Sequence, residues 1–201
     1  MLHALRLKGF ADLEAIAGQT GMYPSEVREL LDHLRVAEHV IYREGRLSGW
    51  ALTPTGRKRH AELIASESEA TGQRDGIDRA YRTFLQVNKV LLGVCTDWQM
   101  RDVEGQHQLN DHSDPAYDKE VVERLRRVDD GVQPVCAEVA VVLGRFSRYG
   151  TRLSTALERV EGGDTDWFTK PVIDSYHTVW FELHEDLLAT LGIERSKEEV
   201  E

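Results

Sequence analysis

The sequence feature that most constrains the fold is a set of apolar stripes with the period of an α-helix after residue 76. One stripe advances in alternating steps of four and three, through Ile77, Tyr81, Phe84, Asn88, Leu91, Cys95 and Trp98. Such steps place side chains on one face of a helix. Only Asn88 interrupts the apolar character of this face. We therefore predict an amphipathic helix over residues 77–98.

Three further helices are predicted from the same period. They span residues 115–128, opened by "SDP", residues 135–160 as one unbroken helix, and residues 168–191. Four amphipathic helices with short connections pack most simply as an antiparallel bundle. One connection, residues 99–113, is long and polar, and a connection of that length is often functional or disordered. We expect no strand after residue 76.

Charge is distributed unevenly along the chain. Residues 1–74 hold 10 Lys and Arg against 10 Asp and Glu, whereas residues 75–201 hold 15 against 25, which accounts for the whole formal charge of −10. Residues 43–60 nevertheless carry a net charge of +4. A local positive patch can bind phosphates on an acidic protein, because the field is screened within about a nanometre.

The first seventy residues predict a different kind of domain. Short helical segments lie near residues 1–8 and 11–17, and a glycine turn at residues 18–21 precedes a helix that starts at Pro24. In that helix we expect Val27, Leu30, Leu31 and Leu34 to face inward. Two short strands flank Gly45, and Thr53 and Pro54 begin a helix that runs to about Glu69. Residues 66–76 are polar and predict a linker, which separates a domain at 1–70 from a helical domain at 76–195.

The order of these elements and two motifs carry a family resemblance. "TGMYPSEVRELLDHL" and "VIYREGRLSGWALTPTGR" resemble the turn, the recognition helix and the wing of MarR- and PadR-like winged helix-turn-helix transcription regulators. The resemblance covers about the first third of the chain. It implies a mainly α protein with a two-stranded wing, a function in transcription regulation, and double-stranded DNA as partner.

The resemblance assigns DNA contacts to seven residues. Arg43 and Arg46 flank the tip of the wing, and Arg57 and Lys58 lie in the first turns of the next helix, where they would contact phosphates. Base or phosphate contacts fall to the start of the recognition helix, at Tyr23, Ser25 and Arg28. The basic residues can instead form a solvated face that pairs with the protein's own acids.

The outward face of the predicted recognition helix is acidic. It carries Glu29 and Asp32, which are unfavourable near phosphates unless they accept hydrogen bonds from cytosine amino groups. This face keeps a second hypothesis open: the winged helix is a protein-interaction module that does not bind DNA.

The last predicted helix has a second apolar stripe beside the first. It contains Ile173, His177, Trp180, His184, Leu187 and Leu191. Two apolar stripes indicate that the helix packs against the bundle on one side and against a second subunit on the other. A homodimer also suits the family resemblance, because palindromic DNA sites need two reading heads. A compatible hypothesis is an effector pocket with aromatic walls and a few polar groups. Its residues would be Phe84, Asn88, Trp98, Tyr149, Tyr176, His177 and Trp180.

Other groups have plainer interpretations. We expect Arg145, Arg148, Arg152 and Arg159 to pair with Glu182, Glu185 and Asp186, although this basic stripe could bind an anionic ligand. "DHSD" at residues 111–114 predicts a helix cap, His177 and His184 are not expected to bind metal, and Cys95 and Cys136 predict buried, reduced thiols. No catalytic pair, cofactor motif, apolar span or signal peptide is evident, so we expect neither an enzyme nor a cofactor and place the protein in the cytoplasm, away from membranes.

Overall fold

The computed structural model describes residues 1–46, 48–103 and 105–195. Leu47, in the predicted wing, and Glu104, in the predicted long connection, lie outside these residues. The chain is mainly helical, as predicted, and divides into two compact units. Unit 1 holds Met1–Gly72 and the residues from Leu188 onward, and unit 2 holds Gln73–Leu187.

Unit 1 combines four helices with a three-stranded antiparallel sheet. Its elements, in order, are α1 (Leu2–Lys8), β1 (Phe10–Ala11), α2 (Leu13–Thr20), α3 (Pro24–Val36), β2 (Val40–Arg43), β3 (Gly49–Leu52) and α4 (Pro54–Thr71). The strand order is β1-β3-β2, so β3 lies in the centre, where Trp50 pairs with both Ala11 and Tyr42. The sequence predicted only β2 and β3, because two residues are too few to show a strand period in β1.

The turn between α2 and α3 is set by local chemistry. Asp12 caps α2 by accepting from the Ala15 N–H at 2.8 Å, and Gly21 ends it in the left-handed region, with φ 70°. Pro24 then opens α3, and the Glu26 carboxylate accepts from the Tyr23 N–H at 3.0 Å. Two helices can therefore follow each other across three residues.

The core of unit 1 lies between these helices and the sheet. Its fully buried side chains include Leu5, Ile16, Val27 and Leu31. Leu34 is partly buried and packs against them. The prediction that Leu30 faces inward is wrong, since Leu30 is 40% exposed. The helix α3 has 13 residues and packs against the core on one side only. The buried face of such a helix is too narrow to hold all four predicted side chains.

The start of α4 fixes the end of the hairpin. The Thr53 hydroxyl accepts from the Gly56 N–H at 2.9 Å and donates to the Glu38 carbonyl at 2.6 Å, while the Thr53 N–H donates to the His39 carbonyl at 3.1 Å. A Cβ at Gly56 would lie 1.8 Å from the His39 carbonyl oxygen. The hydrogen bonds of Thr53 and the absence of a side chain at Gly56 therefore allow the two segments to pack closely at this junction. The predicted linker shrinks to Gly72 and Gln73, because α4 continues to Thr71.

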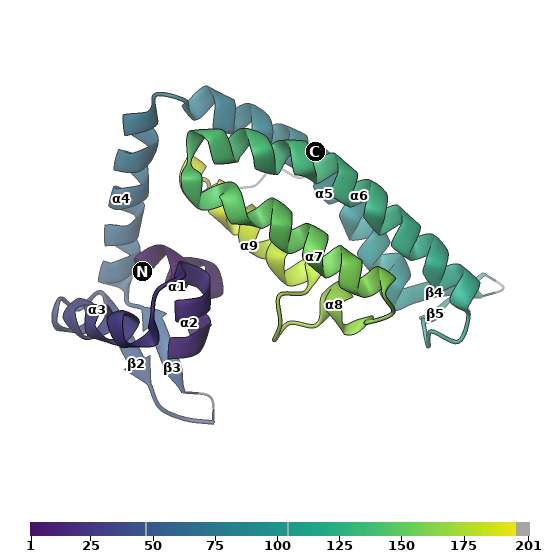
Figure 1. Cartoon of the computed structure of the whole chain (residues 1–201), viewed down its shortest axis with the longest axis horizontal. Helices are drawn as coiled ribbons and strands as arrows, with labels where there is room; N and C mark the ends of the chain where they lie inside the picture. The colour runs from purple at the N-terminus through teal and green to yellow at the C-terminus, as the bar shows by residue number, and fades with distance from the viewer. Residues whose placement is uncertain (47, 104, 196–201) are drawn as a thin grey trace. The chain divides into compact units, whose positions relative to one another are not determined.

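Unit 2 is built mostly of helices that run alongside one another (Figure 1). Its elements are α5 (Arg74–Gln99), β4 (Met100–Val103), β5 (Gln106–Leu109), α6 (Pro115–Val142), the 3₁₀ helix η1 (Gly144–Arg148), α7 (Tyr149–Glu161), α8 (Asp166–Thr169) and most of α9 (Tyr176–Leu191). The connection β4–β5 returns the chain so that α6 is antiparallel to α5. The predicted stripe of α5 is confirmed, from the fully buried Ile77 to the buried Trp98.

The boundaries of two predicted helices in unit 2 are wrong. Residues 115–142 form one helix that passes through Pro134, and the predicted helix over 135–160 is instead broken at Leu143 and Gly144. Its stripe remains buried on both sides of the break, at Val139 and Leu153 among others. An apolar stripe reports which side chains are buried, and it does not report whether the backbone reverses between them.

The connection over residues 99–113 and the last helix also differ from the predictions. Residues 100–109 contain an antiparallel hairpin, although no strand was expected there. The last helix starts at Tyr176 instead of residue 168, and Val172 is exposed. Pro171 disfavours a helical residue before it, and Ser175 accepts from the Thr178 N–H at 3.3 Å to start α9.

Candidate functional site

Three of the seven predicted DNA-contacting residues lie at the start of α3. Tyr23 is 76% exposed, and Ser25 and Arg28 are exposed on the first two turns. The buried Val27 and Leu31 hold the opposite side of the helix in the core of unit 1. Because the capping contact of Glu26 uses the Tyr23 backbone, the tyrosine ring is left for other contacts.

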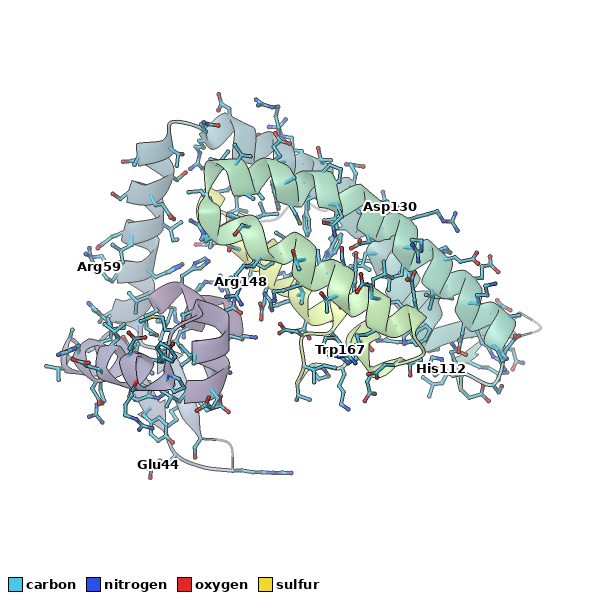
Figure 2. The ribbon with its side chains drawn as sticks, viewed as in Figure 1. Glu44, Arg59, His112, Asp130, Arg148 and Trp167 are labelled. Atoms are coloured by element: carbon cyan, nitrogen blue, oxygen red, sulfur yellow. The ribbon has the colours of Figure 1, made fainter. Side chains whose placement is uncertain are left out.

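The other four residues lie on the β2–β3 hairpin and on α4. Arg43 ends β2, Arg46 follows in the turn, and both are exposed. The turn is closed by Ser48, whose hydroxyl accepts from the Gly45 N–H at 3.3 Å. Arg57 and Lys58 are exposed near the start of α4, and the first turn of this helix has no acidic residue. Figure 2 shows Glu44 at the hairpin and Arg59 on α4.

The acidic residues of α3 are partly neutralised within the helix. Asp32 lies 3.3 Å from Arg35, one turn further along, and both side chains are more than half exposed. Glu29 is exposed as well. An exposed pair of this kind is weak, so it lowers the local negative potential without removing it. The surface of α3 is therefore mixed in charge, while the hairpin and the start of α4 are positive.

Four of the residues predicted to form an effector pocket come together in unit 2. The Trp180 Nε1–H donates to the Asn88 Oδ1 at 2.9 Å, which connects α9 to α5. The Trp180 ring stacks on Phe84 at 4.9 Å and lies 6.0 Å from Tyr176. All three rings are buried. These residues pack against one another as core, with the Asn88 side chain accepting from the indole N–H.

The other three predicted pocket residues lie elsewhere. The Tyr149 hydroxyl donates to Asp186 at 3.1 Å, and burial, then the nearby Asp186 and Glu182 carboxylates, raises the pKa of Tyr149. His177 is exposed. Trp98 lies at the end of α5, where its ring contacts His112 and Phe168 at 4.5 and 4.6 Å.

The predicted pairing of the arginine stripe is confirmed for two of its members. Arg145 contacts Asp186 at 3.0 Å, and Arg152 contacts Glu182 at 2.8 Å and Asp174 at 3.0 Å. Arg159 lies instead over the Trp167 ring, at 5.4 Å. Arg145 and Arg152 therefore serve the contact between α7, η1 and α9. Both cysteines are free, as predicted, but only Cys136 is buried, and Cys95 is half-buried. Burial raises the pKa of Cys95 to about 11 and of Cys136 to about 12.

A pocket lies beside Trp98, and Trp98 is the one residue of its lining that the sequence analysis had assigned to an effector site. Its volume is about 510 Å³. Trp98 and His112 form one wall, one face of the first three turns of α6 forms another, and the end of α7 closes the far side. The apolar part of the lining comes from Pro115, Val122 and Val160.

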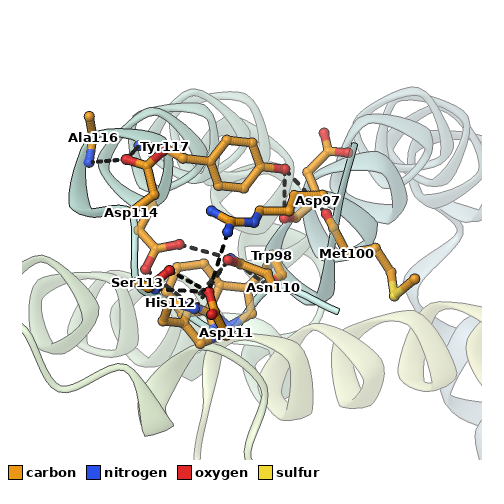
Figure 3. A network of polar contacts seen from close by, with 12 residues as sticks. Asp97, Trp98, Met100, Asn110, Asp111, His112, Ser113, Asp114, Ala116 and Tyr117 are labelled. Carbon is orange, nitrogen blue, oxygen red and sulfur yellow. Dashed lines mark hydrogen bonds and ion pairs between the residues drawn. The ribbon is translucent and has the colours of Figure 1, made fainter. Parts of the chain in front are cut away.

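The polar end of this pocket is a network around Asn110, His112 and Asp118. Figure 3 shows Asn110 and His112 of this network close to Trp98. The His112 Nδ1 lies 3.0 Å from the Asp118 Oδ2, and the Asn110 Nδ2 donates to the Asp118 Oδ1 at 2.8 Å and to the Trp98 carbonyl at 3.1 Å. The Asn110 Oδ1 also accepts from the His112 N–H at 3.2 Å. His112 has a φ of 57°, in the left-handed region.

The predicted cap at residues 111–114 is confirmed in part. Asp114 accepts from the Ala116 and Tyr117 N–H groups and opens α6, and Asp111 accepts from Ser113. His112 has a different role, because it faces Asp118. The signal that could have revealed it is an Asn and an Asp at positions −2 and +6 from a histidine, beside a helix start.

Among residues 1–46, 48–103 and 105–195, no helix has the length and apolar character needed to cross a membrane. Over the same residues, no group of three or more His, Cys, Asp or Glu side chains could hold a metal ion. Comparison of the chain with family models, curated proteins and solved structures found no match.

Proposed function

We propose that the protein is a dimeric DNA-binding transcription regulator, and that unit 1 is its winged helix-turn-helix reading head. In this proposal α3 is the recognition helix and the β2–β3 hairpin is the wing. Arg43, Arg46, Arg57 and Lys58 contact phosphates. Tyr23, Ser25 and Arg28 contact bases or phosphates at the start of α3.

The observation that carries the proposal is the exposure of two arginines on a hairpin that follows a helix–turn–helix pair. Arg43 and Arg46 extend into solvent at the end of a hairpin whose other strand is buried. Cationic side chains on a protruding hairpin suit the phosphate backbone of a duplex, which supplies most of the affinity. The order α2, α3, β2, β3 places this hairpin directly after the proposed reading helix.

The test is binding to duplex DNA from upstream of the protein's own gene, measured by fluorescence anisotropy at several salt concentrations. Each of Arg43→Ala and Arg46→Ala should weaken binding to every duplex and lower the slope of log K against log salt by about 1. Arg28→Ala should instead reduce the preference for the upstream duplex over random DNA.

Arg82→Ala is the matched control, because Arg82 is an exposed arginine of α5, paired with Asp78 at 2.8 Å. It should leave both affinity and salt slope unchanged. An unaltered slope in both hairpin variants would overturn the proposed wing. Equal losses of affinity in the Arg43, Arg46, Arg28 and Arg82 variants would show a diffuse charge effect instead of a reading head.

A second candidate function is a protein-docking module, and the surface of α3 favours it. Besides Glu29 and Asp32, this helix exposes Leu30 and, at 84%, Val36. Exposed apolar side chains beside carboxylates suit a basic, partly apolar protein partner. The same titration separates the two functions, since a docking module would show no binding to any duplex even at low salt.

A further inference from the structure

The pocket beside Trp98 has the size and composition of a small-molecule site. Sites of this kind usually have volumes of about 300–1,000 Å³, apolar walls and a few fixed polar groups. Here the volume is about 510 Å³, and Pro115, Val122 and Val160 supply apolar lining. The pocket lies wholly within unit 2, so it can be considered without unit 1.

The charged groups of the lining favour a positive ligand. Three carboxylates line the pocket, those of Asp118, Glu123 and Glu161, against the two cations Lys119 and Arg126. Arg126 and Glu161 form a close pair at 2.5 Å, whereas Lys119 lies 3.9 Å from Glu123 with both side chains well exposed. The loosely held Glu123 can therefore exchange its partner at little cost.

The histidine presents an acceptor to the pocket. An ionised carboxylate only accepts hydrogen bonds, so the contact between the Asp118 Oδ2 and the His112 Nδ1 requires the proton to be on Nδ1. In the neutral ring this leaves Nε2 as an acceptor. His112 lines the pocket and its Nδ1 is engaged by Asp118, which leaves Nε2 as the ring nitrogen for a ligand that carries an N–H group.

The backbone holds this histidine in place before any ligand arrives. A non-glycine residue rarely adopts the left-handed region, and it persists there only where its surroundings fix it. The Asn110 side chain accepts from the backbone N–H of His112. The same side chain donates to Asp118 and to the Trp98 carbonyl at the end of α5. A pre-formed polar group of this kind loses little entropy on binding.

We propose that this pocket binds an organic ammonium ion with an apolar body. The ammonium group donates to the His112 Nε2 and lies near Glu123, and the apolar body packs on Val122, Val160 and Pro115. This proposal does not depend on DNA binding, because it concerns the protein alone.

The test is isothermal titration calorimetry of the full chain with three probes of one shape. They are 4-phenylbutylamine, which is an ammonium ion at neutral pH, 4-phenylbutan-1-ol and 4-phenylbutyrate. We expect the amine to bind most tightly and the carboxylate least. The trimethylammonium form of the amine, which keeps the charge and lacks N–H groups, should bind more weakly than the amine itself.

Two variants locate the binding. Glu123→Gln should weaken amine binding about fivefold, the size of one exposed ion pair, and leave alcohol binding unchanged. Glu120→Gln is the matched control on the same helix, since Glu120 is exposed and does not line the pocket. Val122→Trp should fill the pocket and abolish binding of every probe, with circular dichroism as the check on its fold.

Each outcome decides the proposal. Amine binding that is weakened by Glu123→Gln and not by Glu120→Gln supports it. Absence of binding by all probes, preference for the carboxylate, or equal effects of the two glutamine variants would overturn it. Since Glu123 and Glu120 are both on the surface, these results stand even if Val122→Trp fails to fold. None of them bears on the affinity of unit 1 for DNA.

Discussion

Single residues in the interior of unit 2 show how polar groups are accommodated by the core. Asp129 of α6 is only 6% exposed, yet it accepts from the Gln133 Nε2–H, the Ser154 hydroxyl and the Tyr176 hydroxyl, at 3.1, 3.3 and 3.2 Å. Burial raises the pKa of Asp129, and the three donors act against that rise. Burial, followed by the effect of Asp129, also raises the pKa of Tyr176.

The raised pKa of Asp129 predicts a definite pH dependence. A carboxyl group whose pKa is higher in the folded state contributes stability below its unfolded pKa of about 3.9, and that stability is lost as pH rises through the folded pKa. Asp129→Asn removes this titration. The wild-type protein should therefore lose stability relative to Asp129→Asn as pH increases from about 4.

Melting temperatures of both proteins between pH 4 and pH 7 measure this difference. The lost acceptor in the asparagine variant adds a constant offset that does not change with pH. Glu138→Gln is the control, because Glu138 is an exposed carboxylate on the same helix. A wild-type-to-variant difference that is the same at every pH would contradict the prediction.

At the scale of elements, the junction of α3, the hairpin and α4 depends on one glycine. Gly56→Ala would place a Cβ 1.8 Å from the His39 carbonyl oxygen, so the chain must move. We expect a loss of about 1–3 kcal/mol, the usual cost of overpacking, and a fall in melting temperature of roughly 2–4 °C per kcal/mol for a chain of this length. Gly18→Ala in α2 is the control, because a Cβ there meets nothing within 4 Å.

Thermal unfolding followed by circular dichroism separates the two glycine variants. Gly18→Ala should be neutral or slightly stabilising, because alanine is favoured over glycine within a helix. Equal stability of the two variants would show that the Gly56 contact relaxes without cost. The hairpin would then be positioned by something other than this junction.

At the scale of the whole molecule, the proposed function predicts a dimer. Two reading heads on a two-fold symmetric DNA site require two copies of the chain. We expect a mass of about twice 22.9 kDa by light scattering at micromolar concentration, and two chains for each bound duplex. A mass of 22.9 kDa both with and without DNA would contradict the dimer and leave a monomeric reader.

The sequence by itself determined the properties that depend on neighbouring residues. The spacing of four and three identified the buried face of α5, and the Thr53-Pro54 and Asp114-Pro115 pairs marked the starts of α4 and α6. The basic residues around the hairpin were also visible. Periods, caps and local charge are encoded within a few residues, so they can be recognised without the rest of the fold.

Only the tertiary structure decided where the backbone reverses and which side chains meet. The break at Leu143 and Gly144 interrupts a stripe whose period continues, and the network of Asn110, His112 and Asp118 joins residues on two sides of a helix start to Trp98. Of the residues predicted for an effector site, Phe84, Tyr176 and Trp180 pack in the core, where the Trp180 indole donates to Asn88, 92 positions away in the chain. Trp98 instead lines a pocket with residues of α6 and α7. Pockets and buried networks arise from contacts between distant segments, and no local pattern specifies which segments will pack together.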